Sequence, residues 1–361
     1  MSFQKVVSRV GEAIAFSALP VALIAVVPTE AKAANLSPQN IDQMYVFGDS
    51  LSDTGNTFTV TGGALPPFPY FQGRYSNGPV WVDDLAQDLG ITLTPFAKIA
   101  TGAATPTAGI NFAFGGSTTG TENTLDYLLP PGSPNLPGLQ QQIGAFTSLV
   151  PATQAADPNA LYVLWAGAND YLPTEGNFVP YQQTGTTLTN LSQAVNSLAA
   201  VGAKNIMVVN LPDLGELPAT LGTAEAANLN NLTAQHNSNL FATLQSTVSP
   251  NVNIIPFDIN SIVNRAIATP SEFGFTNVTD ACLNLSAGTI CSNPNEYLFW
   301  DQRHPTAAAH QIVADAALSA LQAQSVPEPS AGLGFLAFGA LSARSVLKRK
   351  SKQASRVKTG V

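Results

Sequence analysis

Short apolar segments alternate with helix-like segments along most of this 361-residue chain, and this alternation limits the folds open to it. Each apolar segment is rich in branched and aromatic residues and ends in glycine or small polar residues, as buried strands do. We expect strands at 44–47, 110–114, 160–165, 205–211 and 252–257. Strands that alternate with helices form a mostly parallel sheet covered on both faces, so we predict one α/β domain.

Helices are predicted between these strands from apolar residues at helical spacing. One begins near Pro79, and the others cover 139–150, 188–201, 224–247 and an alanine-rich segment from 307 to about 323. Three segments rich in Pro and Gly or small polar residues (57–80, 117–138 and 171–185) are expected to be loops that build a substrate pocket. For the loop before Pro79 two interpretations stay open, a wall of a substrate cleft or a surface loop packed over the sheet.

Ser50 lies just past the first predicted strand, in the segment Gly48-Asp49-Ser50-Leu51. The carboxyl ends of parallel strands are where open α/β sheets bind ligands, so a nucleophile is well placed there. Most serines in turns only cap or shape them, and a catalytic serine needs a base and an oxyanion site. We expect Asp49 and Asp53 to shape this turn through backbone hydrogen bonds rather than to catalyse.

The chain has three histidines, and their surroundings differ. His236 lies in a helix-like stretch among Asn and Gln residues and is interpreted as a structural hydrogen-bonding residue. His310 lies inside the last helix, where it packs or faces solvent. His304 lies in a loop three residues after Asp301, whose carboxylate can reach Nδ1 and leave Nε2 free. Ser50, His304 and Asp301 thus supply a nucleophile, a base and an orienting carboxylate.

The N-terminal segment 1–33 has the pattern of a secretory signal peptide. Lys5 and Arg9 precede an apolar stretch, 13–27, and a small-residue site follows that would be cut after Ala33. A transmembrane anchor is the alternative, but the stretch contains Pro20 and is shorter than the roughly 18–20 residues that a span needs.

The C-terminal segment 326–361 combines Pro327-Glu328-Pro329, an uncharged stretch and a basic tail. In physical terms it is a short hydrophobic segment with a positive stop, marginal as a permanent span. It resembles the bacterial PEP-CTERM sorting signal. That resemblance implies transient membrane anchoring and processing by an exosortase-type transpeptidase after export, which would leave 34–325 as the mature domain in the envelope or outside the cell.

The charge of residues 34–325 limits the kinds of molecule that this part can bind, and its two cysteines indicate a disulfide. This part has 20 acidic residues against five basic ones (Arg74, Lys98, Lys204, Arg265 and Arg303), a net charge of about −15. Such a surface repels nucleic acid and suits a neutral substrate.

Cys282 and Cys291 are expected to form a local disulfide in an exported chain. A zinc site is the alternative, but zinc would need about four ligands and no histidine lies between the two cysteines.

Four short motifs resemble the four blocks of the SGNH (GDSL) hydrolase superfamily and occur in the same order. They are Gly48-Asp49-Ser50-Leu51, the segment 111–116, Gly167-Ala168-Asn169-Asp170 and Asp301-Gln302-Arg303-His304. The first block, extended to Asn56, and the segment 73–78 are similar to the phospholipase/lecithinase/haemolysin-like branch. Position 52 is Ser, so the Gly-x-Ser-x-Gly elbow of ordinary α/β-hydrolases is missing.

The resemblance implies a three-layer α/β/α, flavodoxin-like fold and a serine esterase or lipase that needs no metal or organic cofactor. Ser50 would attack a small-molecule or lipid ester, with His304 as base and Asp301 orienting it. The backbone N–H groups of Ser50 and Gly116 and the side-chain amide of Asn169 would hold the oxyanion. Two alternatives remain: an acyltransferase with the same residues, and a PEP-CTERM surface or matrix protein whose site only binds.

Overall fold

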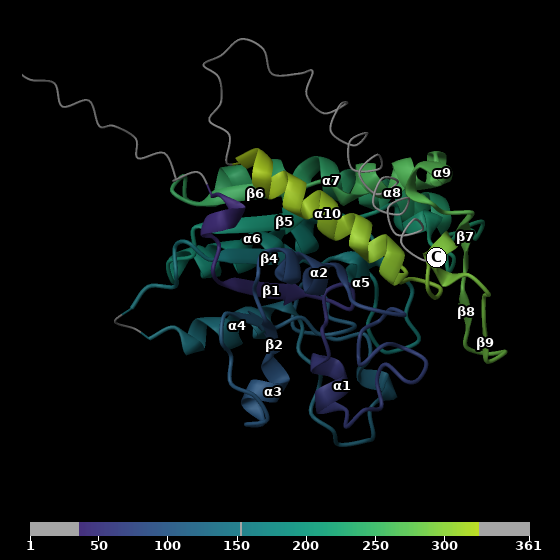
Figure 1. Cartoon of the computed structure of the whole chain (residues 1–361), viewed down its shortest axis with the longest axis horizontal. Helices are drawn as coiled ribbons and strands as arrows, with labels where there is room; N and C mark the ends of the chain where they lie inside the picture. The colour runs from purple at the N-terminus through teal and green to yellow at the C-terminus, as the bar shows by residue number, and fades with distance from the viewer. Residues whose placement is uncertain (1–35, 152–153, 325–361) are drawn as a thin grey trace, which may run out of the picture. The chain divides into compact units, whose positions relative to one another are not determined.

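A computed structural model describes residues 36–151 and 154–324 (Figure 1). The predicted signal peptide and the predicted sorting signal lie outside the described residues. Within these ranges no helix combines the length and apolar character that a membrane crossing requires.

Six parallel strands form the central sheet in the order β2-β3-β1-β4-β5-β6. They are β1 (Met44–Gly48), β2 (Leu93–Pro95), β3 (Gly109–Asn111), β4 (Leu161–Trp165), β5 (Asn205–Val209) and β6 (Asn253–Phe257). From β3 to β6 the strand order is that of flavodoxin-like sheets, 2-1-3-4-5. The predicted mostly parallel α/β fold is confirmed. Strand β2 was not predicted, because its three residues contain no apolar run.

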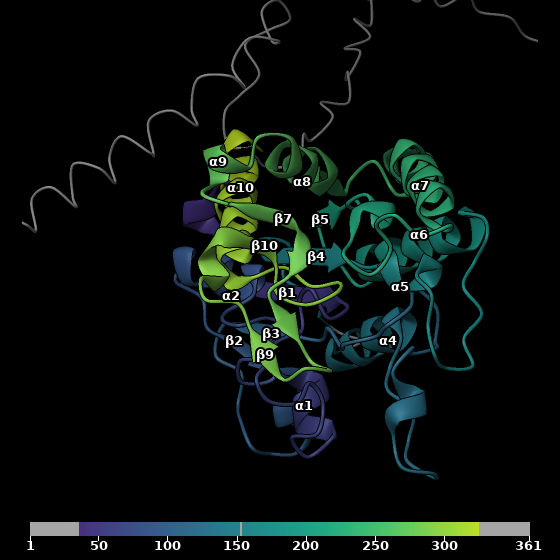
Figure 2. The same ribbon diagram turned by 90° about the vertical axis from the view of Figure 1, so that its right-hand side faces the viewer.

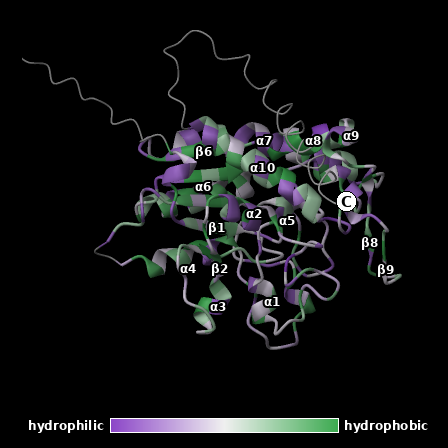
Figure 3. Cartoon of the chain, in the orientation of Figure 1, coloured by the Kyte–Doolittle hydropathy of each residue, from purple (hydrophilic) through white to green (hydrophobic). Residues whose placement is uncertain are grey.

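Alternate residues of each strand enter the two apolar cores on opposite faces of the sheet. Val46, Val163 and Val209 pack with α2 (Trp81–Asp88) and α10 (Ala307–Gln324) on one face. Their neighbours Phe47, Leu164 and Val208 pack on the other face with α4 (Leu139–Leu149), α6 (Gly185–Ala200) and α7 (Ala226–Thr247). Figure 2 shows the strands between α2 and α10 on one side and α4 and α6 on the other, and Figure 3 shows hydrophobic residues concentrated in the central strands.

The remaining elements are short and lie mostly in the connections. The helices are α1 (Asn56–Val60), α3 (Phe96–Ala100), α5 (Ala168–Tyr171), α8 (Ile259–Ala268) and α9 (Pro270–Phe273). Single 3-10 turns are η1 (Pro38–Asn40), η2 (Asp126–Leu128), η3 (Leu214–Glu216) and η4 (Pro294–Glu296). Two small sheets pair β7 (Asn277–Ala281) with β10 (Tyr297–Phe299) and β8 (Leu283–Asn284) with β9 (Thr289–Ile290).

The segment around the cysteines differs from the loop that its composition suggested. Strands β8 and β9 form an antiparallel hairpin there, and the disulfide Cys282–Cys291 joins the residues that flank it. The disulfide was predicted but the hairpin was not, because its strands are only two residues long and polar or exposed at most positions. Cys282, Leu283 and Trp300 form a small buried cluster, against which Tyr70 packs.

Candidate active site

Ser50, His304 and Asp301 form a continuous hydrogen-bonded chain. The Ser50 hydroxyl lies 2.8 Å from His304 Nε2, and His304 Nδ1 lies 2.7 Å from Asp301 Oδ2. Ser50 follows β1, which lies inside the sheet between β3 and β4, whereas the other two residues lie in the loop between β10 and α10. These are the contacts that a nucleophile, a base and an orienting carboxylate require.

The loop that carries His304 is held by its own backbone. Asp301 Oδ1 accepts the backbone N–H groups of Arg303 and His304 at 2.7 and 2.8 Å. The Thr306 hydroxyl accepts the N–H of Ala309 at 3.3 Å, a cap at the start of α10. Burial alone would raise the pKa of Asp301, but the adjacent His304 and the hydrogen bonds that Asp301 accepts hold its pKa below the usual value. The carboxylate is therefore charged beside the imidazole.

Tyr70 is a member of this network that the sequence analysis missed. Its hydroxyl donates to Asp301 Oδ2 at 2.6 Å, the same oxygen that faces His304 Nδ1. Tyr70 lies 231 positions before Asp301, in a Pro-rich loop without periodicity, so no local pattern indicated the contact. Its ring packs edge-on against Trp300.

The segment 73–78 packs against the loop that carries His304. The Ser76 hydroxyl donates to the carbonyl of Pro305 at 2.9 Å, and Asn77 Oδ1 accepts the N–H of Ala307 at 2.8 Å. The ring of Tyr75 lies 5.2 Å from the imidazole of His304. Neither interpretation left open for the loop before Pro79, a cleft wall or a surface loop packed over the sheet, describes these contacts: this part of it supports the loop that carries His304.

On the other side of Ser50, the glycine pair after β3 has two different roles. The N–H of Gly115 donates to Asp53 Oδ2 at 3.0 Å and to the Thr57 hydroxyl at 2.8 Å, so it is already occupied. Gly116 has φ +75°, and in residues 36–151 and 154–324 its N–H meets no hydrogen-bond acceptor. This difference favours Gly116 over Gly115 as an oxyanion donor.

Asn169 lies at the start of α5, after the neighbouring strand β4. Its side-chain amide donates to the carbonyl of Ser117 at 3.0 Å, which links it to the loop that contains Gly116. Asn169 and Ser50 line the same pocket. The motifs that follow β1, β3 and β4 therefore meet at one edge of the sheet.

Asp49 and Asp53 shape the turn around Ser50, as their position suggested. Asp49 Oδ1 accepts the N–H of Leu51 at 3.0 Å, and burial raises the pKa of Asp49 to about 7. Asp53 accepts N–H groups from its own turn and from Gly115, so it also fastens this turn to the glycine pair. Both aspartates are buried.

The end of β1 is fixed by residues that the sequence analysis did not single out. The side-chain amide of Gln142, on α4, accepts the N–H of Gly48 at 2.9 Å and donates to its carbonyl at 2.8 Å. It also donates to the Ser117 hydroxyl at 2.9 Å. Gly48 has φ +153°, and a Cβ there would lie 2.1 Å from the carbonyl oxygen of Trp165, so only glycine fits.

The other two histidines lie in the interior. His236 is fully buried, and its Nδ1 lies 3.1 Å from the Tyr171 hydroxyl, in agreement with the structural role expected. His310 lies on α10 and is 1% exposed, so its ring is in the interior of the protein. Burial lowers the pKa of His236 to about 4 and that of His310 to about 3, so both rings are neutral near pH 7.

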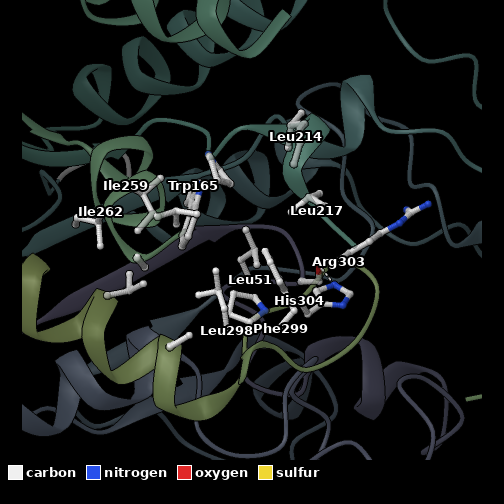
Figure 4. Close-up of a pocket in the computed structure, with 18 of the residues that line it drawn as sticks. Leu51, Trp165, Leu214, Leu217, Ile259, Ile262, Leu298, Phe299, Arg303 and His304 are labelled. Atoms are coloured by element: carbon white, nitrogen blue, oxygen red, sulfur yellow. Dashed lines mark hydrogen bonds between the residues drawn. The ribbon is translucent and has the colours of Figure 1, made fainter. Parts of the chain in front are cut away.

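An apolar pocket opens from Ser50 and His304 (Figure 4). Its walls come from η3, α8, β10 and α10, and include Leu214, Leu217, Ile259, Leu298 and Val313. Figure 4 shows His304 and Arg303 at one side of the pocket and Ile259 and Ile262 at the other. In the part of the chain that the structure describes, no group of three or more His, Cys, Asp or Glu residues could hold a metal ion.

A serine after the first strand of a parallel sheet, with its histidine and aspartate three residues apart before the last helix, defines a hydrolase of the SGNH class. The chain belongs to the GDSL-like Lipase/Acylhydrolase family, whose profile matches residues 44–317. It is a carboxylic ester hydrolase of this family.

Several curated proteins are similar to this chain. The phosphatidylcholine-sterol acyltransferase of Aeromonas hydrophila is 27% identical, over 84% of this chain and 97% of that protein. The thermolabile hemolysin of Vibrio parahaemolyticus is 27% identical, over 78% of this chain and 64% of the hemolysin. A GDSL esterase/lipase of Arabidopsis thaliana is 28% identical, over 76% of this chain and 89% of that protein.

Solved structures that match this chain include an acetylxylan esterase from Geobacillus stearothermophilus. It is 16% identical with a TM-score of 0.42, and the match covers 80% of this chain and 97% of that chain.

Proposed function

We propose that the protein hydrolyses carboxylic esters through an acyl-enzyme on Ser50. The observation that carries the proposal is the hydrogen-bonded chain Ser50–His304–Asp301. The Ser50 hydroxyl attacks the ester carbonyl while His304 Nε2 takes its proton, then returns it to the leaving alcohol. Water, activated by the same nitrogen, releases the acid and restores Ser50.

The negative charge of each tetrahedral intermediate needs donors on the side of Ser50 away from His304. We assign this role to the backbone N–H groups of Ser50 and Gly116 and to the Asn169 amide. Two observations support the assignment: among the residues that the structure describes, the N–H of Gly116 meets no acceptor, and Asn169 is linked to Ser117. Removing one donor of this kind typically lowers the rate by about 10²–10³.

The proposal extends to lipid esters, phospholipids among them, outside the cytoplasm. Two relatives are named for phosphatidylcholine-sterol acyl transfer and for haemolysis, and the pocket beside Ser50 is apolar. Export through 1–33, and processing of 326–361 by an exosortase-type transpeptidase, have their support in the sequence patterns of those segments.

Acyl transfer to an alcohol is the second candidate, and the name of the Aeromonas relative favours it. The two reactions share every step up to the acyl-enzyme and differ in whether water or an alcohol enters. Product analysis with an added sterol or short alcohol separates them, because a transferase forms the new ester in preference to the free acid.

Hydrolysis of p-nitrophenyl esters by residues 34–325 tests the proposed function. Ser50→Ala should abolish turnover and labelling by a serine-directed phosphonate, because it removes the nucleophile. Ser148→Ala, on the exposed side of α4, is the matched control and should keep both. Residual activity of Ser50→Ala near the wild-type level would refute a mechanism through Ser50.

A further inference from the structure

The pocket beside Ser50 is polar at the end near Ser50 and His304 and apolar along the rest of its walls. Its polar and charged lining residues include Asp49, Asn169, Arg303 and His304, which lie at or next to the reacting groups. Beyond them the walls are almost entirely hydrocarbon and mostly buried. Ile259, Ala266 and Phe275 are at most 3% exposed.

We infer that this pocket binds the acyl chain of the substrate, so that the enzyme prefers esters of extended apolar acids over acetyl esters. The inference rests on the proposed function and adds the substrate class of that site. An apolar chain gains free energy on leaving water for such walls, whereas a polar headgroup or a sugar would lose its hydrogen bonds there.

The order of the chemical steps points to the acyl part of the ester rather than to the alcohol part. After the first step the alcohol must leave and water must reach the carbonyl carbon beside His304. A group held in a buried pocket leaves slowly, which suits the acyl chain because it stays attached to Ser50 until the last step. In a lipid ester the alcohol part also carries the polar headgroup, which is better placed in solvent.

The far side of the pocket is formed by α8. Ile259 and Ile262 lie there, across the pocket from His304 (Figure 4). Each methylene that reaches this region leaves water, which raises kcat/KM by up to about fourfold. The side chain at position 262 should then set how long an acyl chain the pocket accepts.

Substitutions at Ile262 in opposite directions test the inference. We expect wild-type kcat/KM to rise from the acetyl to the octanoyl p-nitrophenyl ester. Ile262→Trp fills the far side and should lower the octanoyl-to-acetyl ratio at least tenfold. Ile262→Ala lengthens the pocket and should shift the preference toward dodecanoyl. Ile267, partly buried on the same helix but outside the pocket, is the matched control, and Ile267→Ala should keep the wild-type profile.

A wild-type enzyme that prefers the acetyl ester, or a profile that no Ile262 variant changes, overturns the inference while Ser50-dependent hydrolysis still supports the proposed function. Binding gives a readout that needs no turnover. Ser50→Ala protein should bind laurate more tightly than butyrate, and adding Ile262→Trp should remove that difference. Equal affinity for the two acids in Ser50→Ala protein would overturn the inference even if the protein hydrolyses no test ester.

Discussion

Tyr70 and His304 share one oxygen of Asp301, and this sharing affects how strongly the carboxylate supports a protonated imidazole. The Tyr70 hydroxyl donates to Oδ2 and helps to lower the pKa of Asp301. A carboxylate whose negative charge already accepts a hydrogen bond from Tyr70 stabilises the protonated imidazole of His304 less strongly. In the proposed mechanism Tyr70 is thus a positioning residue that also tunes the base, His304, through Asp301.

Tyr70→Phe should move the acid limb of the kcat/KM profile to higher pH by roughly half a unit, because Oδ2 then interacts with the imidazolium alone. The phenyl ring keeps the packing against Trp300. The control is Tyr127→Phe, which removes a hydroxyl 3.5 Å from Glu175 in another loop and should leave the limb in place. A lower rate with an unshifted limb would mean that the Tyr70 hydroxyl only positions Asp301 and does not tune the base.

At the residue scale, the sequence was informative wherever a motif is local. Asp301 and His304 are three positions apart, and Ser50 follows an obvious strand, so their spacing and surroundings indicated their chemistry. Tyr70 and Gln142 contact residues 231 and 94 positions away, and neither belongs to a pattern. Contacts of that kind depend on how the loops pack, which residue type does not determine.

Among the elements, the hairpin of β8 and β9 and its disulfide contact Tyr70, and through it Asp301, by way of the buried cluster of Cys282, Leu283 and Trp300. Cys282 is buried with Trp300, and Tyr70 packs on the same cluster. The bond closes a loop between cysteines nine positions apart. Loop closure of that length removes freedom from the unfolded chain, which stabilises the folded state by roughly 2–3 kcal/mol.

Replacing both cysteines by serine should therefore lower the free energy of unfolding by roughly 2–3 kcal/mol in urea denaturation. Because Tyr70 packs on this cluster, kcat should fall as well. Reduction of the wild-type disulfide is the matching treatment, and it should have no effect on the double variant. Unchanged stability and kcat in the double variant would show that the hairpin holds its place without the bond.

The sequence indicated five strands of the central sheet, β3 and the edge strand β6 among them, and most clearly those that cross its buried middle. β1, β4 and β5 show continuous apolar runs because both of their faces are covered. β2, β8 and β9 have three residues or fewer, and β7 is mostly polar. Such strands exist because of their neighbours, so their own residues carry little signal.

For the whole molecule, the order of the strands brings the motifs together. β1 lies between β3 and β4, so the turns after these three strands are neighbours although they are far apart in the chain. A parallel α/β sheet predicts that they share an edge. The pocket was not predictable in the same way. Of the three loops expected to build it, 57–80 and 117–138 contribute no lining residue and 171–185 contributes only Leu172, whereas many of the apolar walls come from η3, α8, β10 and α10.

The stability of the whole fold in acid depends on two buried groups, His310 and Asp49, whose pKa values are shifted in opposite directions. His310 has a pKa near 3 in the folded protein against a usual value of 6.5, so below pH 6.5 the unfolded chain binds a proton that the folded protein does not. This costs about 2 kcal/mol of stability between pH 7 and pH 5. Asp49 acts in the opposite direction, because its pKa is raised to about 7 and the folded protein takes up a proton first.

Comparing His310→Leu with the wild type isolates the histidine, since the carboxylates are the same in both. Neither ring nitrogen of His310 has a hydrogen-bond partner in residues 36–151 and 154–324, so leucine breaks no such bond there. Between pH 7 and pH 5 the variant should lose about 2 kcal/mol less stability than the wild type in urea denaturation. Gln311→Leu, one position along α10, is the control: it replaces a side chain that does not titrate and should keep the wild-type dependence of stability on pH. Equal losses in His310→Leu and the wild type would mean that His310 takes up its proton in the folded protein at an ordinary pH, and that the core around α10 admits water.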